Sequence, residues 1–424
     1  MSDTMKNFSD VIVVGGGPSG SFCAFNLAKK AVKVMVFEEH NEIGVPCHCA
    51  GHLSINGLKG LGLYPLPRGV LESIFYGAKF YSPKGSEFSI RFPSPATCAV
   101  NRTLFDRYLS QLAEKAGAHY LLGSKVEHLV FKKDRVEVST LRTSGETAKF
   151  YGKIVVDAEG VAYKVVREAG LRPPSKNSLV YCVNADVENV KDVESDEVEV
   201  FLGNTYAPGF YAWLIPKEEG KAKVGLGAKV GNPKNLLRKL MYKHPAASKK
   251  LKRAKVVKES FHPIPLGGPI ERAYSNRFII VGDAASQVKP TTGGGVILGL
   301  NCAKAAAKTV VDAINSQNFS AKFLRAYQKS FQRFLGFDML VMREIRKMLN
   351  ILSDEKLDDF IGFCKKNFGE NGLQDLGDID FQGRMLLKAL RKPRNATVIM
   401  YFASLIFRSA FKRESIDKIW LENC

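Results

Sequence analysis

The sequence predicts an α/β protein in which a parallel sheet is interrupted by a sheet-rich insertion and followed by a helical C-terminal region. Three observations predict this class. The apolar run 11–14 leads directly into a glycine-rich turn and then a helix. Residues 179–262 are rich in strand-like segments, whereas the chain beyond about residue 319 has helical apolar spacing. With 424 residues, 45% of them hydrophobic, the chain can form two or three domains.

The first strand and turn carry a glycine fingerprint. Residues 11–14, Val-Ile-Val-Val, have the apolar, β-branched character of a parallel strand that is buried on both faces. Gly15, Gly17 and Gly20 follow with G-x-G-x-x-G spacing, and Ser19 lies in the same turn. Gly15 permits a tight turn, Gly17 allows the backbone to approach a pyrophosphate, and Gly20 allows close packing of helix on strand.

The same unit closes with an acidic residue. Helix 19–29 directs its positive N-terminal end toward the pyrophosphate, and strand 32–37 ends at Glu38, with Glu39 next. A carboxylate at Glu38 accepts hydrogen bonds from both ribose hydroxyls of an adenosine and disfavours a 2′-phosphate. The unit is therefore Rossmann-like and fits FAD or NAD better than NADP. An ordinary βαβ unit without a ligand is the alternative interpretation.

Local patterns predict the remaining elements. Turn residues predict a loop at 41–54, and alternating apolar residues predict a hairpin at 75–92, strands at 126–138 and 147–156, and a buried strand at 278–283. Helical spacing predicts helices at 101–116 and 296–315. The first of these is amphipathic, with Leu104, Phe105, Tyr108, Leu109 and Leu112 on one face.

These elements predict three regions. We expect a discontinuous nucleotide-binding domain, a sheet-rich domain inserted into it, and a helical C-terminal region. The predicted limits are 8–75, 99–175 and 270–318 for the first, 76–98 and 176–269 for the second, and 319–424 for the third.

The charge of the chain indicates an anionic partner or a solvated lysine-rich surface. Lys and Arg number 62 against 42 Asp and Glu, so the formal net charge is +20. Such a surplus attracts nucleic acid, an anionic membrane surface or a phosphorylated substrate. No nucleic-acid-binding motif accompanies the charge, so we expect no nucleic-acid partner.

Cysteine spacing and the N-terminus indicate a cytoplasmic enzyme without a metal site. The eight cysteines are thinly spread, and Cys47-His48-Cys49 has no second cysteine pair at metal-site spacing. The first ten residues lack the pattern of a signal peptide. The longest apolar run, 396–407, is too short to span a bilayer.

A second glycine-rich segment follows the buried strand at 278–283. Gly282 and Asp283 place a carboxylate at the carboxyl end of that strand, which is the usual ligand edge of an open α/β sheet. After Pro290 the chain enters a helix through three glycines, Gly293, Gly294 and Gly295. Their backbone N–H groups stabilise an anion, such as the N1–C2=O edge of a reduced flavin. A tight helix entry without a ligand is the alternative.

In this order the pieces resemble flavoproteins of the p-hydroxybenzoate hydroxylase and glutathione reductase fold type. The resemblance implies FAD, with its diphosphate at 15–20, its ribose at Glu38 and further contacts from Arg102. It also implies ribityl contact at Asp283 and an isoalloxazine ring beside 290–295. The middle motif of that fold is usually Asp-Gly, which matches Glu159-Gly160 here.

Within that fold the chain is similar to the geranylgeranyl reductase family, from about residue 8 to 365. The matching segments are Glu42-Ile-Gly44 with Pro46, Cys49 and Ala50, then Gly51 to Ser54, Arg102 with Phe105-Asp106, Ala207 to Lys217, Val224 to Gly227, and Pro290 to Gly295. The Tyr-x-Trp-x-Ile-Pro-Lys pattern in 211–217 overlaps Trp-x-Trp-x-Ile-Pro of flavin halogenases. Tyr211 in its first position favours the reductases.

The resemblance assigns catalytic candidates. Cys49 matches the cysteine that the family places near the flavin, and its thiol can orient an alkene or relay a proton; an inert buried cysteine is the alternative. Tyr211 and Trp213 are two residues apart and point to one face of a strand. With Phe201 and Phe210 they either wall a tunnel for a prenyl chain or pack the two domains together.

The implied reaction reduces isoprenoid double bonds. Reduced FAD delivers hydride to one carbon of a C=C bond and a proton reaches the other, with NAD(P)H or reduced ferredoxin as electron donor. The substrate is a prenylated phospholipid of archaeal membranes, which gives the basic surface a reason. Other interpretations are a flavin monooxygenase or halogenase, a menaquinone side-chain reductase or electron-transfer flavoprotein relative, and a non-catalytic adaptor.

The apolar run 396–407 has two interpretations. Its basic flanks, Arg391, Lys392 and Arg394 before it and Arg408, Lys412 and Arg413 after it, are typical of a helix that lies on an anionic membrane. Peripheral association with the inner face of the cell membrane would follow. A core or tunnel-capping helix is the alternative.

Overall fold

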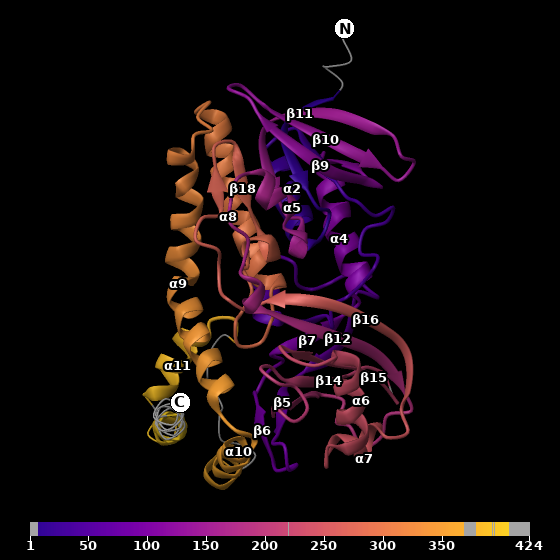
Figure 1. Ribbon diagram of the computed structural model, residues 1–424, viewed down its shortest axis with the longest axis vertical. Helices are drawn as coiled ribbons and strands as arrows, with labels where there is room; N and C mark the ends of the chain where they lie inside the picture. Colours follow the sequence, from indigo (N-terminus) through magenta and orange to yellow (C-terminus); the bar gives the residue numbers. More distant parts are fainter. Residues whose placement is uncertain (1–6, 219, 369–378, 392, 394, 407–424) are drawn as a thin grey trace, which may run out of the picture.

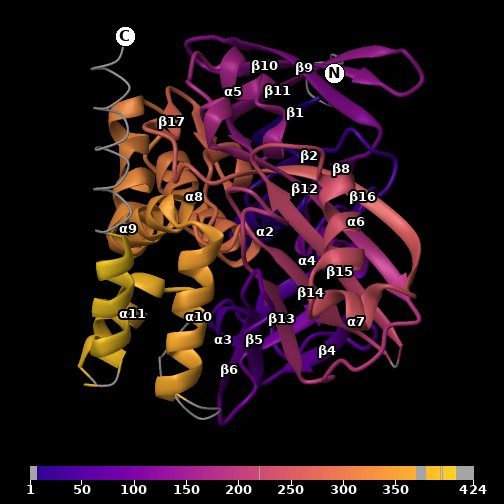
Figure 2. The same ribbon diagram turned by 60° about the horizontal axis from the view of Figure 1, so that its bottom comes forward.

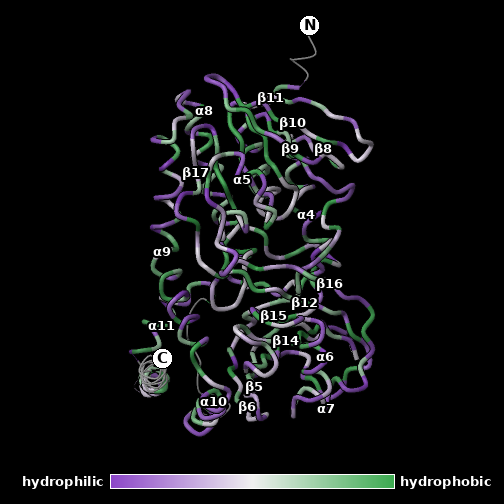
Figure 3. The backbone as a smooth tube through the Cα atoms, in the orientation of Figure 1, coloured by the Kyte–Doolittle hydropathy of each residue, from purple (hydrophilic) through white to green (hydrophobic). Residues whose placement is uncertain are grey.

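The computed structural model describes residues 7–406 except 219, 369–378, 392 and 394. Two sheet-containing halves lie one above the other along the longest axis, and helix α9 (Ala321–Ile351) runs beside both (Figure 1). Figure 3 shows that hydrophobic segments gather in the interior of each half.

The upper half contains an eight-stranded sheet that begins with the predicted glycine unit. Strand β1 (Phe8–Val14) pairs in parallel with β2 (Val34–Phe37) on one side and β11 (Thr147–Asp157) on the other, so 11–14 is buried as predicted. Helix α2 (Pro18–Ala28) packs against α4 (Arg102–Lys115) and α8 (Val296–Asn315). The other strands are β8 (His119–Leu121), β9 (Ser124–Phe131), β10 (Val136–Arg142), β17 (Tyr274–Ser275) and β18 (Phe278–Ile280).

The lower half is a seven-stranded sheet assembled from two distant parts of the chain. Strand β5 (Gly77–Tyr81) pairs in parallel with β13 (Glu197–Phe201), which attaches the hairpin of β5 and β6 (Glu87–Arg91) to the later strands. Those strands are β12 (Leu179–Glu188), β14 (Ala212–Pro216), β15 (Lys221–Ala228) and β16 (Lys255–Pro265), in the sheet order β16-β12-β15-β14-β13-β5-β6.

The remaining elements are a three-stranded sheet and several short helices. Strand β7 (Thr97–Val100) pairs with both β3 (His52–Ser54) and β4 (Leu71–Phe75). The short helices are α3 (Ile55–Gly60) and α5 (Lys164–Glu168), with α6 (Pro233–Lys243) and α7 (Ala247–Leu251) packed on the larger lower sheet. The predicted domain limits stay a prediction.

Three local predictions need correction. The loop predicted at 41–54 ends in strand β3, because His52–Ser54 pairs with β7, which is distant in sequence. Leu104 is 38% exposed, since α4 buries Phe105 and Leu109 and turns Leu104 outward. The region predicted to be sheet-rich also contains the helices α6 and α7.

The helical C-terminal region closes one side of both halves. Helix α9 is followed by α10 (Asp354–Phe368), which lies next to β6, and by α11 (Gln382–Leu390), which packs against α9; α10 and α11 lie side by side in Figure 2. Ser353 Oγ accepts a hydrogen bond from the Lys356 backbone N–H at the start of α10 and thus caps this helix.

The apolar run 396–407 is helical up to residue 406, and the rest of it lies outside the described residues, as do Lys392, Arg394, Arg408, Lys412 and Arg413. Val398 and Leu405 are buried, whereas Met400 is 63% exposed. Across the described part of the chain, no helix has the length and apolar content needed to cross a bilayer.

The buried His244 makes stability depend on pH. Its Nδ1 accepts hydrogen bonds from the backbone N–H groups of Ala246 and Ala247, so its Nε2 donates to the Ser82 carbonyl. Burial lowers the pKa of His244 to about 4, although the Ser82 carbonyl and Asp358 oppose this shift. Below about pH 6.5, His244 is therefore protonated in the unfolded chain but stays neutral in the native state until the pH approaches about 4.

We expect stability to fall as the pH decreases from about 6.5 to 4. His244 alone removes about 2 kcal/mol of unfolding free energy between about pH 7 and pH 5. Urea unfolding of the wild type and of the His244→Gln variant at pH 7 and pH 5 measures the part of this decrease that comes from His244. His128→Gln, at an exposed histidine, is the control and keeps the full pH dependence. An unchanged dependence in His244→Gln would contradict the assignment.

Candidate active site

A cavity of about 1160 Å³ lies between the two halves and reaches the helical region. Most of the residues predicted from the motifs line it. They are Gly15, Gly17, Ser19, Glu38, Glu39, Cys49, Ala50, Arg102, Glu159, Tyr211, Trp213, Gly282, Asp283, Gly293, Gly294 and Gly295. Gly20 and Pro290 do not line it. The fold thus brings three separated glycine or acid motifs to one space.

The three fingerprint glycines differ in what surrounds them. Gly15 has a φ of +96°, and a Cβ there would lie 2.4 Å from the Ala158 carbonyl oxygen. A Cβ on Gly20 would lie 1.9 Å from the Gly15 carbonyl oxygen, so this glycine is needed for packing. A Cβ on Gly17 would meet nothing within 4 Å, because Gly17 faces the open cavity. This space at the start of α2 fits a pyrophosphate.

Glu38 is held at the edge of the same space. Its Oε2 accepts a hydrogen bond from the Gly16 backbone N–H at 2.8 Å, and its Oε1 accepts one from the His40 N–H at 3.0 Å. The His40 ring Nδ1 lies 2.6 Å from Oε1. These contacts orient the carboxylate at the cavity wall, which is the position that a ribose-binding acid requires. Glu39 lies 3.6 Å from the Lys125 ammonium.

Arg102 and Asp283 are two oppositely charged residues that line the cavity. Arg102, at the start of α4, donates to both carboxylate oxygens of Asp106 at 3.0–3.1 Å and is almost fully buried. Burial raises the pKa of Asp283 to about 6, although Arg102 lowers it. Asp283 still contacts the cavity, so its carboxylate is available to a ligand hydroxyl group.

Glu159 supports the cavity through the backbone. Its two carboxylate oxygens accept hydrogen bonds from the N–H groups of Lys164 and Val166 at 2.9 Å each. The side chain thus satisfies N–H groups in the first turn of α5. The capping contacts explain why an acid is useful here, and they leave less of the carboxylate for a direct ligand contact.

The glycine-rich segment 289–295 is fixed from several directions. The Tyr211 hydroxyl donates to the Thr292 carbonyl at 2.6 Å, and the Lys289 ammonium lies 2.6 Å from the Asp380 carboxylate. The segment leads into α8, whose N-cap, Gly295, offers no side-chain cap. The first N–H groups of this 20-residue helix therefore remain available to an anion.

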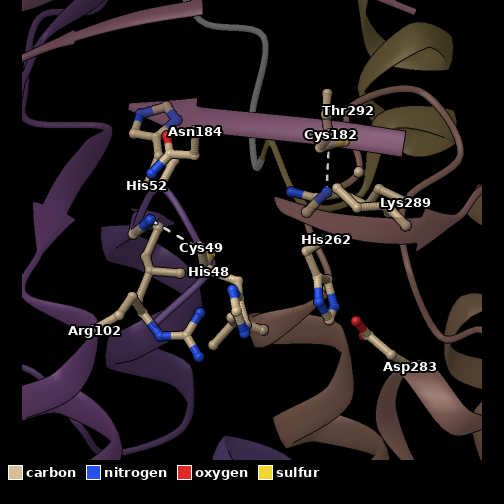
Figure 4. A pocket seen from close by; sticks show the side chains of 18 of the residues that line it. His48, Cys49, His52, Arg102, Cys182, Asn184, His262, Asp283, Lys289 and Thr292 are labelled. Carbon is tan, nitrogen blue, oxygen red and sulfur yellow. Dashed lines mark hydrogen bonds between the residues drawn. The ribbon is translucent and has the colours of Figure 1, made fainter. Parts of the chain in front are cut away.

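Cys49 lies on the wall opposite Asp283 and Lys289 (Figure 4). Its Sγ accepts a hydrogen bond from the Gly51 N–H at 3.4 Å. Next to it, the His48 ring stacks on the His262 ring with centroids 5.4 Å apart. His262 comes from β16, and nothing in the local sequence indicated it. Only the pairing of β16 with β12 brings it to the cavity.

His52 lies within the matching segment Gly51 to Ser54, but no pattern in the sequence assigned it a role. Its side chain is exposed to the cavity, yet protein surrounds that part of the cavity. Burial lowers the pKa of His52 to about 4, with a further contribution from Lys289. Its Nε2 lies 2.7 Å from the Thr97 hydroxyl. The ring is therefore neutral near pH 7 and is oriented by Thr97.

Beyond the aromatic pair the cavity becomes apolar. Tyr211 and Trp213 share a face of the strand, with ring centroids 5.8 Å apart, and Phe210 lines the cavity beside them. The prediction for Phe201 was wrong, because Phe201 turns into the lower core and stacks on Tyr81. The apolar walls come from β5, β6, β13, α9 and α10 with nearby segments, and include Ala78, Phe80, Phe88, Ile90, Phe92, Val198, Val200, Leu202, Ile345, Leu349, Leu357, Phe360, Ile361, Ile379 and Met385.

Comparison with known proteins matches residues 9–334 to a family described as FAD binding domain. The digeranylgeranylglycerophospholipid reductase 2 of Methanothermobacter thermautotrophicus is 33% identical over 82% of this chain and 90% of that protein. The digeranylgeranylglycerophospholipid reductase of Methanosarcina mazei is 29% identical over 96% of this chain and 98% of that protein.

Solved structures show the same architecture. A geranylgeranyl bacteriochlorophyll reductase-like protein from Thermoplasma acidophilum is similar with a TM-score of 0.83 and 26% identity, over 94% of this chain and 99% of that one. A flavin-dependent brominase has a TM-score of 0.68 at 18% identity, over 98% of this chain and all of that one. The brominase likeness extends to the fold alone.

The fingerprint glycines predict two distinct mutant behaviours. Gly20→Ala lowers the free energy of unfolding by about 3 kcal/mol, because the new methyl group overlaps the Gly15 carbonyl. Gly17→Ala leaves stability unchanged and weakens FAD retention at least about tenfold, ~1.4 kcal/mol, because the methyl group enters the ligand space. Thermal unfolding and flavin absorbance after gel filtration measure the two effects.

Gly336→Ala is the control for these variants, because Gly336 lies in α9 with nothing within 4 Å of its Cβ position. It retains both stability and flavin. Full flavin retention in a folded Gly17→Ala protein would show that the pyrophosphate does not bind beside Gly17.

Proposed function

The chain belongs to the family of FAD-binding digeranylgeranylglycerophospholipid reductases, and we propose that it saturates the isoprenoid C=C bonds of a digeranylgeranyl glycerophospholipid. The observation that carries this proposal is the two-part cavity. One part has the residues that suit a dinucleotide, and it continues into an apolar part that suits a long hydrocarbon chain.

The dinucleotide part suits FAD. We assign the diphosphate to Gly15, Gly17 and Ser19, the adenosine ribose to Glu38, and the ribityl hydroxyls to Asp283. The remaining candidates are Gly20 and Pro290 through the backbone shape, and Glu39, Cys49, Ala50, Arg102, Glu159, Gly282, Gly293, Gly294 and Gly295 as neighbours of the cofactor. Bound FAD, when reduced, supplies the hydride for the reaction.

The protein residues orient the double bond and exclude water. Tyr211 and Trp213 stand where the dinucleotide part meets the apolar part, so their rings limit how an isoprenoid chain approaches the segment 290–295. Cys49 lies across the cavity from Asp283 and is the candidate to orient the alkene or relay the proton. The apolar walls keep water from competing for that proton.

The charge of the protein supports a location at the membrane surface. A net charge of +20 favours the anionic headgroup of a phospholipid and the surface that contains it. We therefore propose peripheral association with the inner face of the membrane. The electron donor in this proposal is either NAD(P)H or reduced ferredoxin, and anaerobic reduction by each, followed at the flavin absorbance, distinguishes them.

Small molecules extracted from the purified protein test the proposed function. A visible flavin spectrum followed by mass spectrometry detects FAD together with a prenyl lipid in the expected case. Absence of flavin would contradict the proposal at its base. FAD without any prenyl lipid, even after incubation with an unsaturated archaeal diether lipid, would contradict the lipid specificity and favour a monooxygenase of this fold.

Narrowing the apolar part selects against long chains. Ala78, on β5, lines the cavity, so Ala78→Phe places a ring in the path of the hydrocarbon. We expect at least a tenfold loss of activity, ~1.4 kcal/mol, on lipids with geranylgeranyl chains and a smaller loss with geranyl chains. Val230→Phe, at a side chain that is 72% exposed, is the control and changes neither activity. An equal loss of activity for both chain lengths would contradict the proposal that the apolar part of the cavity holds the hydrocarbon chain.

A further inference from the structure

Arg346 occupies a position on α9 where the sequence pattern calls for an apolar residue. The buried face of this helix runs through Leu335, Met339 and Met342, each three or four residues after the last. Arg346 continues that stripe and is only 7% exposed. A charged side chain at the end of an apolar stripe needs a reason beyond the packing of the helix.

The guanidinium group of Arg346 is bound to backbone carbonyl groups. Its Nε donates to the Pro290 carbonyl oxygen at 3.0 Å, and its Nη2 donates to the Thr291 carbonyl oxygen. Its Cζ lies 4.7 Å from the centre of the Phe210 ring. Arg346 therefore contacts the segment that leads to Gly293, Gly294 and Gly295.

This arginine has no carboxylate partner within ion-pairing distance among the residues that the structure describes. The other cations around the site each have one. Lys289 pairs with Asp380, Arg102 with Asp106, and Arg384 with Asp338. Because a buried charge without a counter-charge is costly, the unpaired guanidinium suits a site whose ligand carries negative charge.

The hydrogen bonds of Arg346 polarise neighbouring peptide groups of the backbone. Each carbonyl that receives a guanidinium N–H shares a peptide unit with the next residue's N–H group. Bonding at Pro290 and Thr291 therefore polarises the N–H groups of Thr291 and Thr292. These N–H groups and those of the first turn of α8 carry partial positive charge, and the guanidinium of Arg346 adds a full positive charge beside the same segment.

We propose that Arg346 is a positioning residue for FAD that favours its anionic reduced form and thereby raises its reduction potential. The inference rests on the proposed function, because it requires FAD beside 290–295. Reduction adds two electrons from an external reductant and one proton from solvent, so the neutral oxidised ring gains one negative charge. A fixed cation stabilises the product of this step more than the reactant.

The experiment compares the flavin midpoint potential of three variants with that of the wild type, by anaerobic reduction with dithionite beside a reference dye. Arg346→Met is expected to shift the two-electron equilibrium toward the oxidised form by ten- to a hundredfold, which lowers the potential by about 30–60 mV. Arg346→Lys, which keeps the charge, shows less than half of that change. Arg343→Met, at an exposed arginine beside Glu344 on the same helix, shows none.

A change of less than about threefold in Arg346→Met, under roughly 15 mV, would overturn the inference. So would an unchanged potential together with weaker binding of the lipid, because Arg346 would then recognise the phosphate of the substrate. Absence of bound flavin would contradict the proposed function itself. A bound flavin whose potential is unaltered in Arg346→Met would contradict only the role of Arg346.

The wild type supplies a second measurement that needs no variant to fold. If the reduced ring stays anionic, one proton accompanies two electrons and the potential falls by about 30 mV per pH unit down to about pH 5.5. A slope near 60 mV per pH unit between about pH 6 and 7 would mean that two protons accompany two electrons. That result would show a neutral reduced ring and would overturn the inference.

Discussion

The site depends on how the segment 289–295 is held. Tyr211 binds it from the lower sheet, Arg346 binds it from α9, and Asp380 pairs with Lys289 from the C-terminal region. The hydroxyl of Thr291 also bonds to the Gln382 side chain. A segment with three successive glycines has little rigidity of its own, so these contacts fix its N–H groups before a ligand arrives.

The same contacts couple the three regions of the protein. Helix α9 is fixed to the upper sheet by Tyr327, whose hydroxyl donates to the Ile280 carbonyl at 2.9 Å, and it reaches the lower half near Arg346. The helical region therefore forms a wall of the apolar part of the cavity and also supports the segment 289–295. The proposed hydrocarbon part of the cavity and the proposed cofactor site therefore share contacts with α9.

The sequence predicted what local patterns determine. The unit from Val11 to Glu38 and the helix 296–315 were confirmed because glycine spacing, strand character and helix period act within a few residues. The resemblance to geranylgeranyl reductases was confirmed by the relatives. His262, His52 and Arg346 were missed because strand pairing or helix docking brings them to the cavity. Phe201 was misplaced because side chains alternate along β13: Val200 and Leu202 line the cavity, whereas Phe201 points into the lower core and stacks on Tyr81.

The most direct test is a single anaerobic turnover. Protein whose flavin has been reduced stoichiometrically is mixed with an unsaturated digeranylgeranyl glycerophospholipid in the absence of oxygen. The account predicts that the flavin is reoxidised while the lipid gains two hydrogen atoms, or two mass units, for each flavin consumed. A flavin that stays reduced until oxygen is admitted, with the lipid mass unchanged, would contradict it.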